Sequence, residues 1–275
     1  MTLYIVGDIM KKFILLIIVV VLVFLLAPVI FNNTISSKKV QNEFEKSKCY
    51  RKENLTRYQN YQKKEPDLKI KEIVLRVNMN LDRDFYTNTK VVKNPSRIDV
   101  LINKYYHFPD GYEPDDLVVL PSEYARGGMK LRKEAKEALD KLVESAKKDN
   151  MDIYVQSSYR SYDYQVKLYN NYQAKDGKEA ADKYSARPGY SEHQTGLSID
   201  IGTKKVSFNN FENTEEYNWM QANAYRYGFI LRFPKNKEAI TGYIYESWHY
   251  RYVGKKIAKR IHDNKLSLEE YIACN

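Results

Sequence analysis

The sequence predicts an α+β domain, with a small and mostly antiparallel sheet flanked by helices, preceded by one N-terminal transmembrane helix. Two observations lead to this fold class. In residues 115–275, helix-like and short strand-like segments are interspersed without the regular βαβ alternation of a parallel sheet. Ahead of them, residues 13–31 (FILLIIVVVLVFLLAPVIF) carry no charge. The length of 275 residues allows a core that needs no disulfide framework.

The apolar run at residues 13–31 is about long enough to cross a ~30 Å hydrocarbon core as a helix. Lys11 and Lys12 precede it and no small-x-small cleavage site follows, so we expect an uncleaved signal anchor rather than a buried core helix. The short leading segment 1–12 favours a cytoplasmic N-terminus. Lysines that follow the apolar run weaken the difference in positive charge between its two ends. We also expect Met10 to be the true start.

Three regions are expected after the anchor. Residues 32–65 are polar and charged, and they predict a stalk or a helix of marginal stability. Residues 66–114 form a lead-in region, in which 69–79 is the first segment able to bury side chains and 108–114 carries the Gly and Pro residues of loops. Residues 115–275 form the main domain.

Hydrophobic periodicity and capping residues place the elements of the main domain. Strands are expected at 152–158, 196–201, 229–233 and 243–252. Helices are expected at 131–146, 161–172, 177–184, 213–228 and 254–264, and from 267 onward. Ser161 can cap the second of these helices, and Ser267 opens a capping box for the last. Asn213 and Glu216 resemble an N-terminal capping pair for the helix that Gly228 closes.

Charge and cysteine content exclude several classes of site. The chain carries 45 Lys and Arg against 35 Asp and Glu, a net charge of +10, which would suit an anionic polymer. The charges are scattered and no nucleic-acid motif accompanies them, so we expect a solvated surface and no nucleic-acid binding. The two cysteines, Cys49 and Cys274, cannot build a Cys-rich zinc site, and whether they pair is open.

Two of the four histidines have neighbours that suggest a metal site. His193 is followed by Asp200, and His249 is preceded by Glu246. Two imidazoles and a carboxylate form a three-ligand zinc site whose fourth position is open for water, as a hydrolase needs. A further carboxylate beside that water can take its proton. His107 and His262 lie outside these segments, and we expect them at the surface.

The spacing of these residues does not by itself establish a shared metal site. Residues seven or three apart on a regular strand point to opposite faces. His193 and Asp200 can therefore share a metal only if the chain turns between them, for which Gly196 is the obvious place. Glu246 and His249 likewise need a bend or bulge to converge. The alternative is two independent histidines packed in a Tyr-rich core.

Three blocks of sequence resemble the signatures of a known family. They are SSYRS at 157–161 with Gln165, SEHQTGLSID at 191–200, and ESWH at 246–249. In order and separation they are similar to the zinc D-alanyl-D-alanine carboxypeptidases of the VanY type, which include L,D-carboxypeptidases of the LdcB type. The resemblance covers about residues 115–265. It implies a D,D-peptidase/hedgehog-like fold and one Zn²⁺ per chain.

The resemblance also implies roles for particular residues. His193, Asp200 and His249 become the zinc ligands, Glu246 the catalytic base, and Arg160 the group that stabilises the oxyanion. Positions that line the substrate pocket in the family are weaker candidates for substrate binding here, namely Ser158, Gln165 and Ser191. Trp248 either walls the zinc site or packs in the core.

The expected function is that of a membrane-anchored, extracytoplasmic bacterial zinc carboxypeptidase that removes the C-terminal D-Ala from peptidoglycan stem peptides. The D-Ala-D-Ala bond is the first expectation, and the L,D bond of tetrapeptide stems is the alternative. Two further alternatives are a non-catalytic cell-wall-binding module and an endopeptidase. The role could be antibiotic resistance or ordinary wall maturation.

Overall fold

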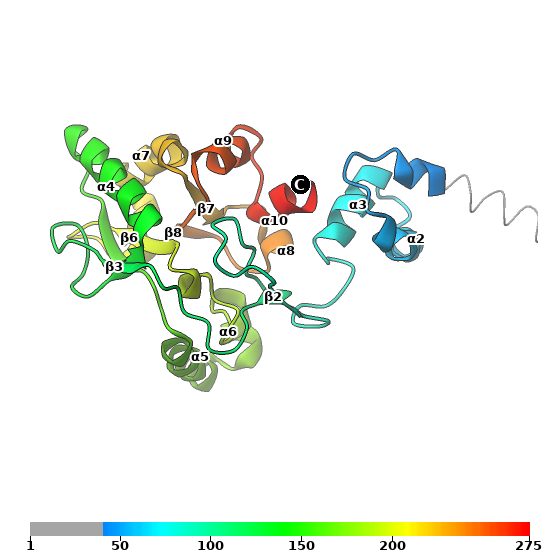
Figure 1. Cartoon of the computed structure of the whole chain (residues 1–275), viewed down its shortest axis with the longest axis horizontal. Coiled ribbons are helices and arrows are strands. Elements are labelled where there is room, and N and C mark those ends of the chain that lie inside the picture. The colour runs from blue at the N-terminus through cyan, green and yellow to red at the C-terminus, as the bar shows by residue number, and fades with distance from the viewer. Residues whose placement is uncertain (1–40) are drawn as a thin grey trace, which may run out of the picture. The chain divides into compact units, whose positions relative to one another are not determined.

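The computed structural model describes residues 41–275 and divides into two compact units, with the boundary between Val77 and Asn78 (Figure 1). The transmembrane helix expected at 13–31, the segment 1–12 with its choice of start, and the first part of the stalk lie outside the described residues. Within residues 41–275, no helix has both the length and the apolarity needed to cross a membrane.

The described part of the smaller unit is largely helical. It contains a 3₁₀ turn, η1 (Lys52–Asn54), followed by α2 (Leu55–Lys64), and α3 (Ile70–Asn78) continues to the unit boundary. For residues 41–65, where the sequence predicts a stalk or a marginal helix, the structure therefore has a helix at 55–64. The rings of Phe44 and Tyr58 stack with centroids 5.4 Å apart, so this polar stretch makes aromatic contacts of its own.

A four-stranded antiparallel sheet lies at the centre of the larger unit. Its strand order is β5 (Tyr154–Ser157), β6 (Ser198–Gly202), β8 (Glu246–Tyr252) and β7 (Phe229–Phe233). The larger unit also contains two separate two-stranded sheets. In one, β1 (Lys90–Val91) pairs in parallel with β2 (Tyr106–His107), and in the other, β3 (Leu117–Val119) pairs antiparallel with β4 (Lys130–Arg132). The predicted α+β class with a mostly antiparallel sheet is confirmed.

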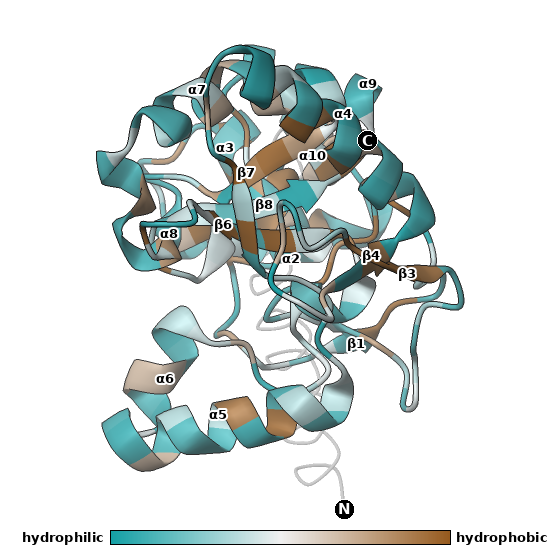
Figure 2. Ribbon diagram, turned by 90° about the vertical axis from the view of Figure 1, so that its left-hand side faces the viewer, coloured by the Kyte–Doolittle hydropathy of each residue, from teal (hydrophilic) through white to brown (hydrophobic). Residues whose placement is uncertain are grey.

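Helices cover the sheet on two sides. In Figures 1 and 2, α4 (Lys133–Lys148), α7 (Glu215–Asn223) and α9 (Lys255–Asp263) lie on one side, and α5 (Tyr162–Asp176) and α6 (Lys178–Tyr184) lie on the other. The remaining short elements are α8 (Glu238–Thr241), α10 (Leu268–Ala273), η2 (Glu192–Thr195), η3 (Phe208–Asn213) and η4 (Ala224–Tyr227).

The main core fills the space between the sheet and α4. Leu139 and Leu142 of α4 are fully buried together with Ile199 and Ile201 of β6 and with Tyr250 of β8. Side chains alternate across a strand, so the residues between these apolar positions point to the opposite face of the sheet. The sheet thus separates an apolar core face from a polar face that carries the site.

Two of the three predicted caps are confirmed. The Ser161 side chain accepts a hydrogen bond from the Tyr164 N–H, and Ser267 forms a complete capping box with Glu270. The predicted cap at Asn213 is wrong. Asn213 is the last residue of η3, so its backbone is already helical, whereas Thr214 has the extended backbone of an N-cap and its side chain accepts from the Tyr217 N–H.

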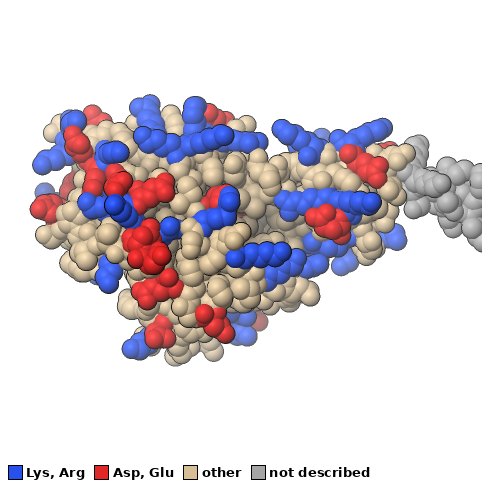
Figure 3. Space-filling view, viewed as in Figure 1, with Lys and Arg blue, Asp and Glu red and all other residues tan. Residues whose placement is uncertain are grey.

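The charges of the larger unit are mixed. On the face drawn in Figure 3, Lys and Arg side chains are interspersed with Asp and Glu side chains over this unit. Many of these charges form local pairs on helix surfaces, such as Lys136 with Asp140 and Lys148 with Glu144. This distribution is that of the solvated surface that the sequence predicts.

Candidate active site

A tight turn at Gly196 brings His193 and Asp200 together. Gly196 ends η2 in the left-handed conformation, with φ +66°. A Cβ at this position would lie 2.8 Å from Leu117 Cδ2 and 2.9 Å from Arg132 Cγ, so the close approach also requires glycine. The chain reverses here from η2 into β6. As a result, His193 Nε2 lies 3.3 Å from Asp200 Oδ2.

A bulge in β8 brings Glu246 and His249 together. Leu231 of β7 pairs with Tyr250, whereas Phe233 pairs with Glu246, so β8 contains extra residues between the two pairs. Such a bulge changes the direction of the side chains along the strand. Glu246 Oε2 consequently lies 3.5 Å from His249 Nδ1, although the two residues are three apart.

His193, Asp200 and His249 form a buried cluster that can hold a metal ion. One ligand atom from each lies within 4.8 Å of the other two. Asp200 and His249 are direct cross-strand partners on β6 and β8. His193 Nδ1 donates to the Ser158 carbonyl at 2.6 Å, so the lone pair is on Nε2. His193 Nε2 and Asp200 Oδ1 are buried, with no hydrogen-bond partner among the described residues. This set of donors fits Zn²⁺.

The electrostatics of the cluster also suit metal binding. Burial, reinforced by the nearby Arg160, lowers the pKa of His193 to about 4, so this imidazole is neutral. Burial would raise the pKa of Asp200, but the facing His193 and His249 hold it well below its usual range. Burial would lower the pKa of His249, but the nearby carboxylates of Asp200 and Glu192 raise it to about 9, so a bound metal would displace a proton from this imidazole.

Glu246 lies at the edge of this cluster and has the properties of a proton carrier. It is buried, and burial raises its pKa to about 8, partly offset by the charge of His249. A carboxyl group that titrates near neutral pH can both accept and return a proton during a reaction. The structure thus places Glu246, the base that the family resemblance implies, beside the three candidate metal ligands.

Arg160 extends from the loop after β5 toward the same cluster. Its Nη2 lies 3.6 Å from Asp200 Oδ2, and its Nη1 donates to Gln165 Oε1 at 3.3 Å. The Gln165 amide in turn donates to the Ala186 carbonyl at 2.7 Å. The guanidinium is therefore held by its neighbours and directed at the metal cluster.

Gln165 and Ser158, two of the weaker candidates for substrate binding, have hydrogen-bond partners within the protein. The Gln165 amide hydrogen-bonds to Arg160 and to the Ala186 carbonyl, and so links α5 to the loop after α6. The Ser158 hydroxyl accepts from the Lys130 N–H and lies 3.3 Å from Met129 Sδ. Both side chains are buried, so their contacts position Arg160 and the loop around His193.

A single cleft of about 750 Å³ is lined by every residue predicted to be catalytic, substrate-binding or metal-ligating. Ser191 is buried at the start of η2, and the half-buried ring of Trp248 packs 5.4 Å from the ring of Phe208. The predicted residues that line the cleft are Ser158, Arg160, Gln165, Ser191, His193, Asp200, Glu246, Trp248 and His249.

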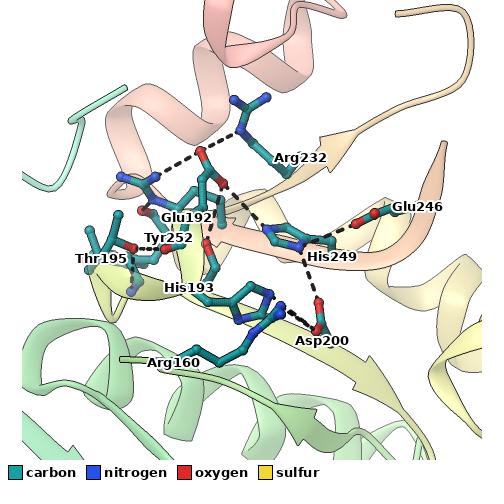
Figure 4. A network of polar contacts seen from close by, with 12 residues as sticks. Arg160, Glu192, His193, Thr195, Asp200, Arg232, Glu246, His249 and Tyr252 are labelled. Atoms are coloured by element: carbon teal, nitrogen blue, oxygen red, sulfur yellow. Dashed lines mark hydrogen bonds and ion pairs between the residues drawn. The ribbon is translucent and has the colours of Figure 1, made fainter. Parts of the chain in front are cut away.

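Sequence reasoning missed a buried charge cluster behind the candidate metal ligands, formed by Glu192, Arg232, Arg251 and Glu269. Figure 4 shows Glu192 between Arg232 and His249. All four side chains are nearly inaccessible to solvent. A signal was present in the sequence: Arg232 and Arg251 interrupt apolar strands, and a charge within a buried strand requires an opposite charge near it.

Comparison with known proteins gives one consistent family. Residues 128–255 match the family model described as VanY, D-alanyl-D-alanine carboxypeptidase. The protein YodJ of Bacillus subtilis (strain 168) is 46% identical over 189 residues, which are 66% of this chain and 69% of YodJ.

Two solved structures have the same fold. The LdcB LD-carboxypeptidase is 45% identical, with a TM-score of 0.64 over 67% of this chain and 90% of the other. A variant of the vancomycin resistance D,D-pentapeptidase VanY, in complex with Zn(II), is 35% identical, with a TM-score of 0.56 over 63% of this chain and 98% of the other.

Proposed function

Because the chain belongs to the VanY family of D-alanyl-D-alanine carboxypeptidases, we propose that it removes the C-terminal D-Ala from peptidoglycan stem peptides with one bound zinc ion. The observation that carries this proposal is the buried cluster of His193, Asp200 and His249, with Glu246 Oε2 3.5 Å from His249 Nδ1. The ligands and the proton carrier thus lie at one point of the cleft.

Each residue around the cluster has its own role in the proposed hydrolysis. Zinc, when bound by His193, Asp200 and His249, supplies a water of lowered pKa and polarises the scissile carbonyl. Glu246 accepts the proton of the attacking water and returns it to the amine of the departing D-Ala. Arg160 donates N–H groups to the carbonyl oxygen as negative charge develops there.

The L,D bond of tetrapeptide stems is a second candidate. The specific observation in its favour is the stronger likeness to the LdcB structure, at 45% identity and a TM-score of 0.64, than to the VanY structure, at 35% and 0.56. Both reactions release D-Ala and need the same chemistry at the metal cluster. They differ only in the residue that precedes the scissile bond.

The proposal includes a location outside the cytoplasm, on a membrane anchor. It is supported by the uncharged run at 13–31, which follows Lys11 and Lys12, and by the extracytoplasmic position of peptidoglycan. Protease treatment of intact cells tests it. Degradation of residues 41–275 without cell lysis is expected, and full protection of this part would refute the external location.

The reaction is tested by incubating the purified full-length chain with synthetic pentapeptide and tetrapeptide stems, with and without a chelator. Chelator-sensitive release of D-Ala from the pentapeptide establishes the D,D activity, and release from the tetrapeptide establishes the L,D activity. A new internal amine without free D-Ala would identify an endopeptidase. Peptide binding without any product would identify a non-catalytic wall-binding module.

A further inference from the structure

Glu192 is held from one side by two buried arginines. Its Oε1 accepts from Arg232 Nε at 2.7 Å and from Arg251 Nη1 at 3.0 Å. Glu192 is 4% exposed and both arginines are 0% exposed, so water does not weaken these contacts. Two buried guanidinium groups that donate to one carboxyl oxygen favour the ionised form of Glu192.

The other oxygen of Glu192 faces a metal ligand. Glu192 Oε2 lies 3.5 Å from His249 Nε2 (Figure 4). The Ser198 hydroxyl donates to the same oxygen at 3.5 Å. The opposite ring nitrogen, His249 Nδ1, lies 3.2 Å from Asp200 Oδ1. The imidazole of His249 therefore lies between the metal cluster on one side and the buried charge cluster on the other.

We propose that Glu192 is a positioning residue that keeps a proton on His249 Nε2 and so leaves the Nδ1 lone pair for zinc. This role of Glu192 rests on the zinc site of the proposed function. A histidine ligand binds a metal through one ring nitrogen, and a carboxylate that accepts from the other nitrogen fixes both the tautomer and the ring orientation. Glu192 is the carboxylate that faces Nε2.

The rest of the charge cluster prevents Glu192 from turning away. Arg232 forms a bidentate salt bridge with Glu269, in which Nη1 donates at 2.9 Å and Nη2 donates at 2.7 Å. Arg251 also donates to the backbone carbonyls of Ile98 and Val100 at 3.0 Å each. Each arginine is thus fixed at a second point, and together they require an acceptor at the Oε1 position of Glu192.

This requirement makes Glu192→Gln an informative variant. The two arginines will hold the amide oxygen at the former Oε1 position, which leaves the NH₂ group facing His249 Nε2. That group donates and cannot accept, so it will favour the tautomer with the proton on Nδ1, where zinc would bind. We expect zinc affinity, measured by competition with a chelator, to fall about 10- to 100-fold.

Glu269→Gln is the matched control. It makes the same chemical change in the same buried charge cluster, since Glu269 also accepts from Arg232 and is 2% exposed. Glu269 contacts Arg232 and Asn103, neither of which is a candidate metal ligand. We expect zinc affinity to stay within about twofold, although thermal stability falls because a buried charge pair is broken.

The zinc affinities of the two variants show whether Glu192 positions His249 or only stabilises the fold. Equal losses of zinc affinity in both variants, or no loss in Glu192→Gln, would overturn the proposal. Nitrogen-15 NMR of the zinc-loaded wild-type protein gives a second test that needs no variant to fold. A His249 ring with the proton on Nε2 and metal on Nδ1 supports the proposal, and the reverse arrangement refutes it. A wild-type chain that binds no zinc would refute the proposed function instead.

Discussion

Glu246 and Arg160 reach the cleft from different parts of the chain, and each is set by its surroundings. Burial gives Glu246 a pKa near 8, and Gln165 holds the Arg160 guanidinium toward Asp200. The sequence predicted both residues from their place in family signatures. Burial and the hydrogen bond to Gln165 depend on the folded chain, so only the structure gives a physical basis for the roles proposed for them.

Replacement of Glu246 by alanine is expected to remove turnover without removing the metal. The variant loses the group that carries the proton, which typically contributes 10²- to 10⁴-fold, while His193, Asp200 and His249 are untouched. The measurements are kcat for D-Ala release and zinc content by elemental analysis. Near-normal activity in a zinc-loaded variant would contradict the proposed mechanism.

Replacement of Arg160 by alanine is expected to lower kcat/KM by about 10²- to 10³-fold, because the developing oxyanion loses a positioned donor. Steady-state kinetics on the same peptide measure the effect. Arg97, whose side chain is 63% exposed and which pairs with Asp99, provides the control. Arg97→Ala should leave kcat/KM unchanged, and an equal loss in both variants would argue against a specific role for Arg160.

At the scale of elements, two local irregularities assemble the site. The turn at Gly196 and the bulge in β8 overcome spacings that regular strands would not allow. The sequence predicted both as conditions for a shared metal site and placed the turn correctly. It could not establish them, because the bulge depends on how β7 pairs with β8.

Gly196→Ala is expected to destabilise the fold and to disturb the site. The left-handed backbone alone costs about 1–3 kcal/mol for a residue with a Cβ, and the new atom would also approach Leu117 and Arg132 too closely. Denaturant unfolding and zinc affinity measure the two effects. Gly127→Ala is the matched change, since its Cβ would meet no described atom within 4 Å, and it should alter stability by less than about 1 kcal/mol.

The cap of α7 gives a direct test of the one capping assignment that was wrong. Thr214→Ala removes the side chain that accepts from the Tyr217 N–H and should cost about 1 kcal/mol of unfolding free energy. Asn213→Ala should cost clearly less, because its backbone is part of η3. Chemical denaturation measures both variants. A larger loss at Asn213 would favour the original assignment.

For the whole molecule, the fold class and most elements were predictable, whereas their arrangement was not. Alternation and capping locate β5, β6, β7 and α10, because these signals are local. The order β5-β6-β8-β7 arises from pairings between segments far apart in the chain. The buried charge cluster likewise joins η2, β7, β8 and α10, so no short stretch of sequence reveals it.

Removal of the metal is expected to abolish activity while the fold remains. The main core lies on the opposite face of the sheet from the metal cluster, so it does not depend on the ion. A ligand present at 100 times its Kd stabilises the native state by about 2.7 kcal/mol. Chelation should therefore lower Tm by several degrees and leave the far-ultraviolet circular dichroism intact. Added zinc should restore both Tm and activity, and loss of the spectrum would contradict this.

The direct pairing of Asp200 with His249 has a consequence for how the chain reaches its native state. If β6 and β8 paired with a shift of two residues, the apolar side chains would stay on the core face. Ser198 or Gly202 would then stand opposite His249, and a metal ligand would be lost. Zinc uptake during refolding would therefore distinguish correctly registered chains from slipped ones, and excess zinc would favour the correct register.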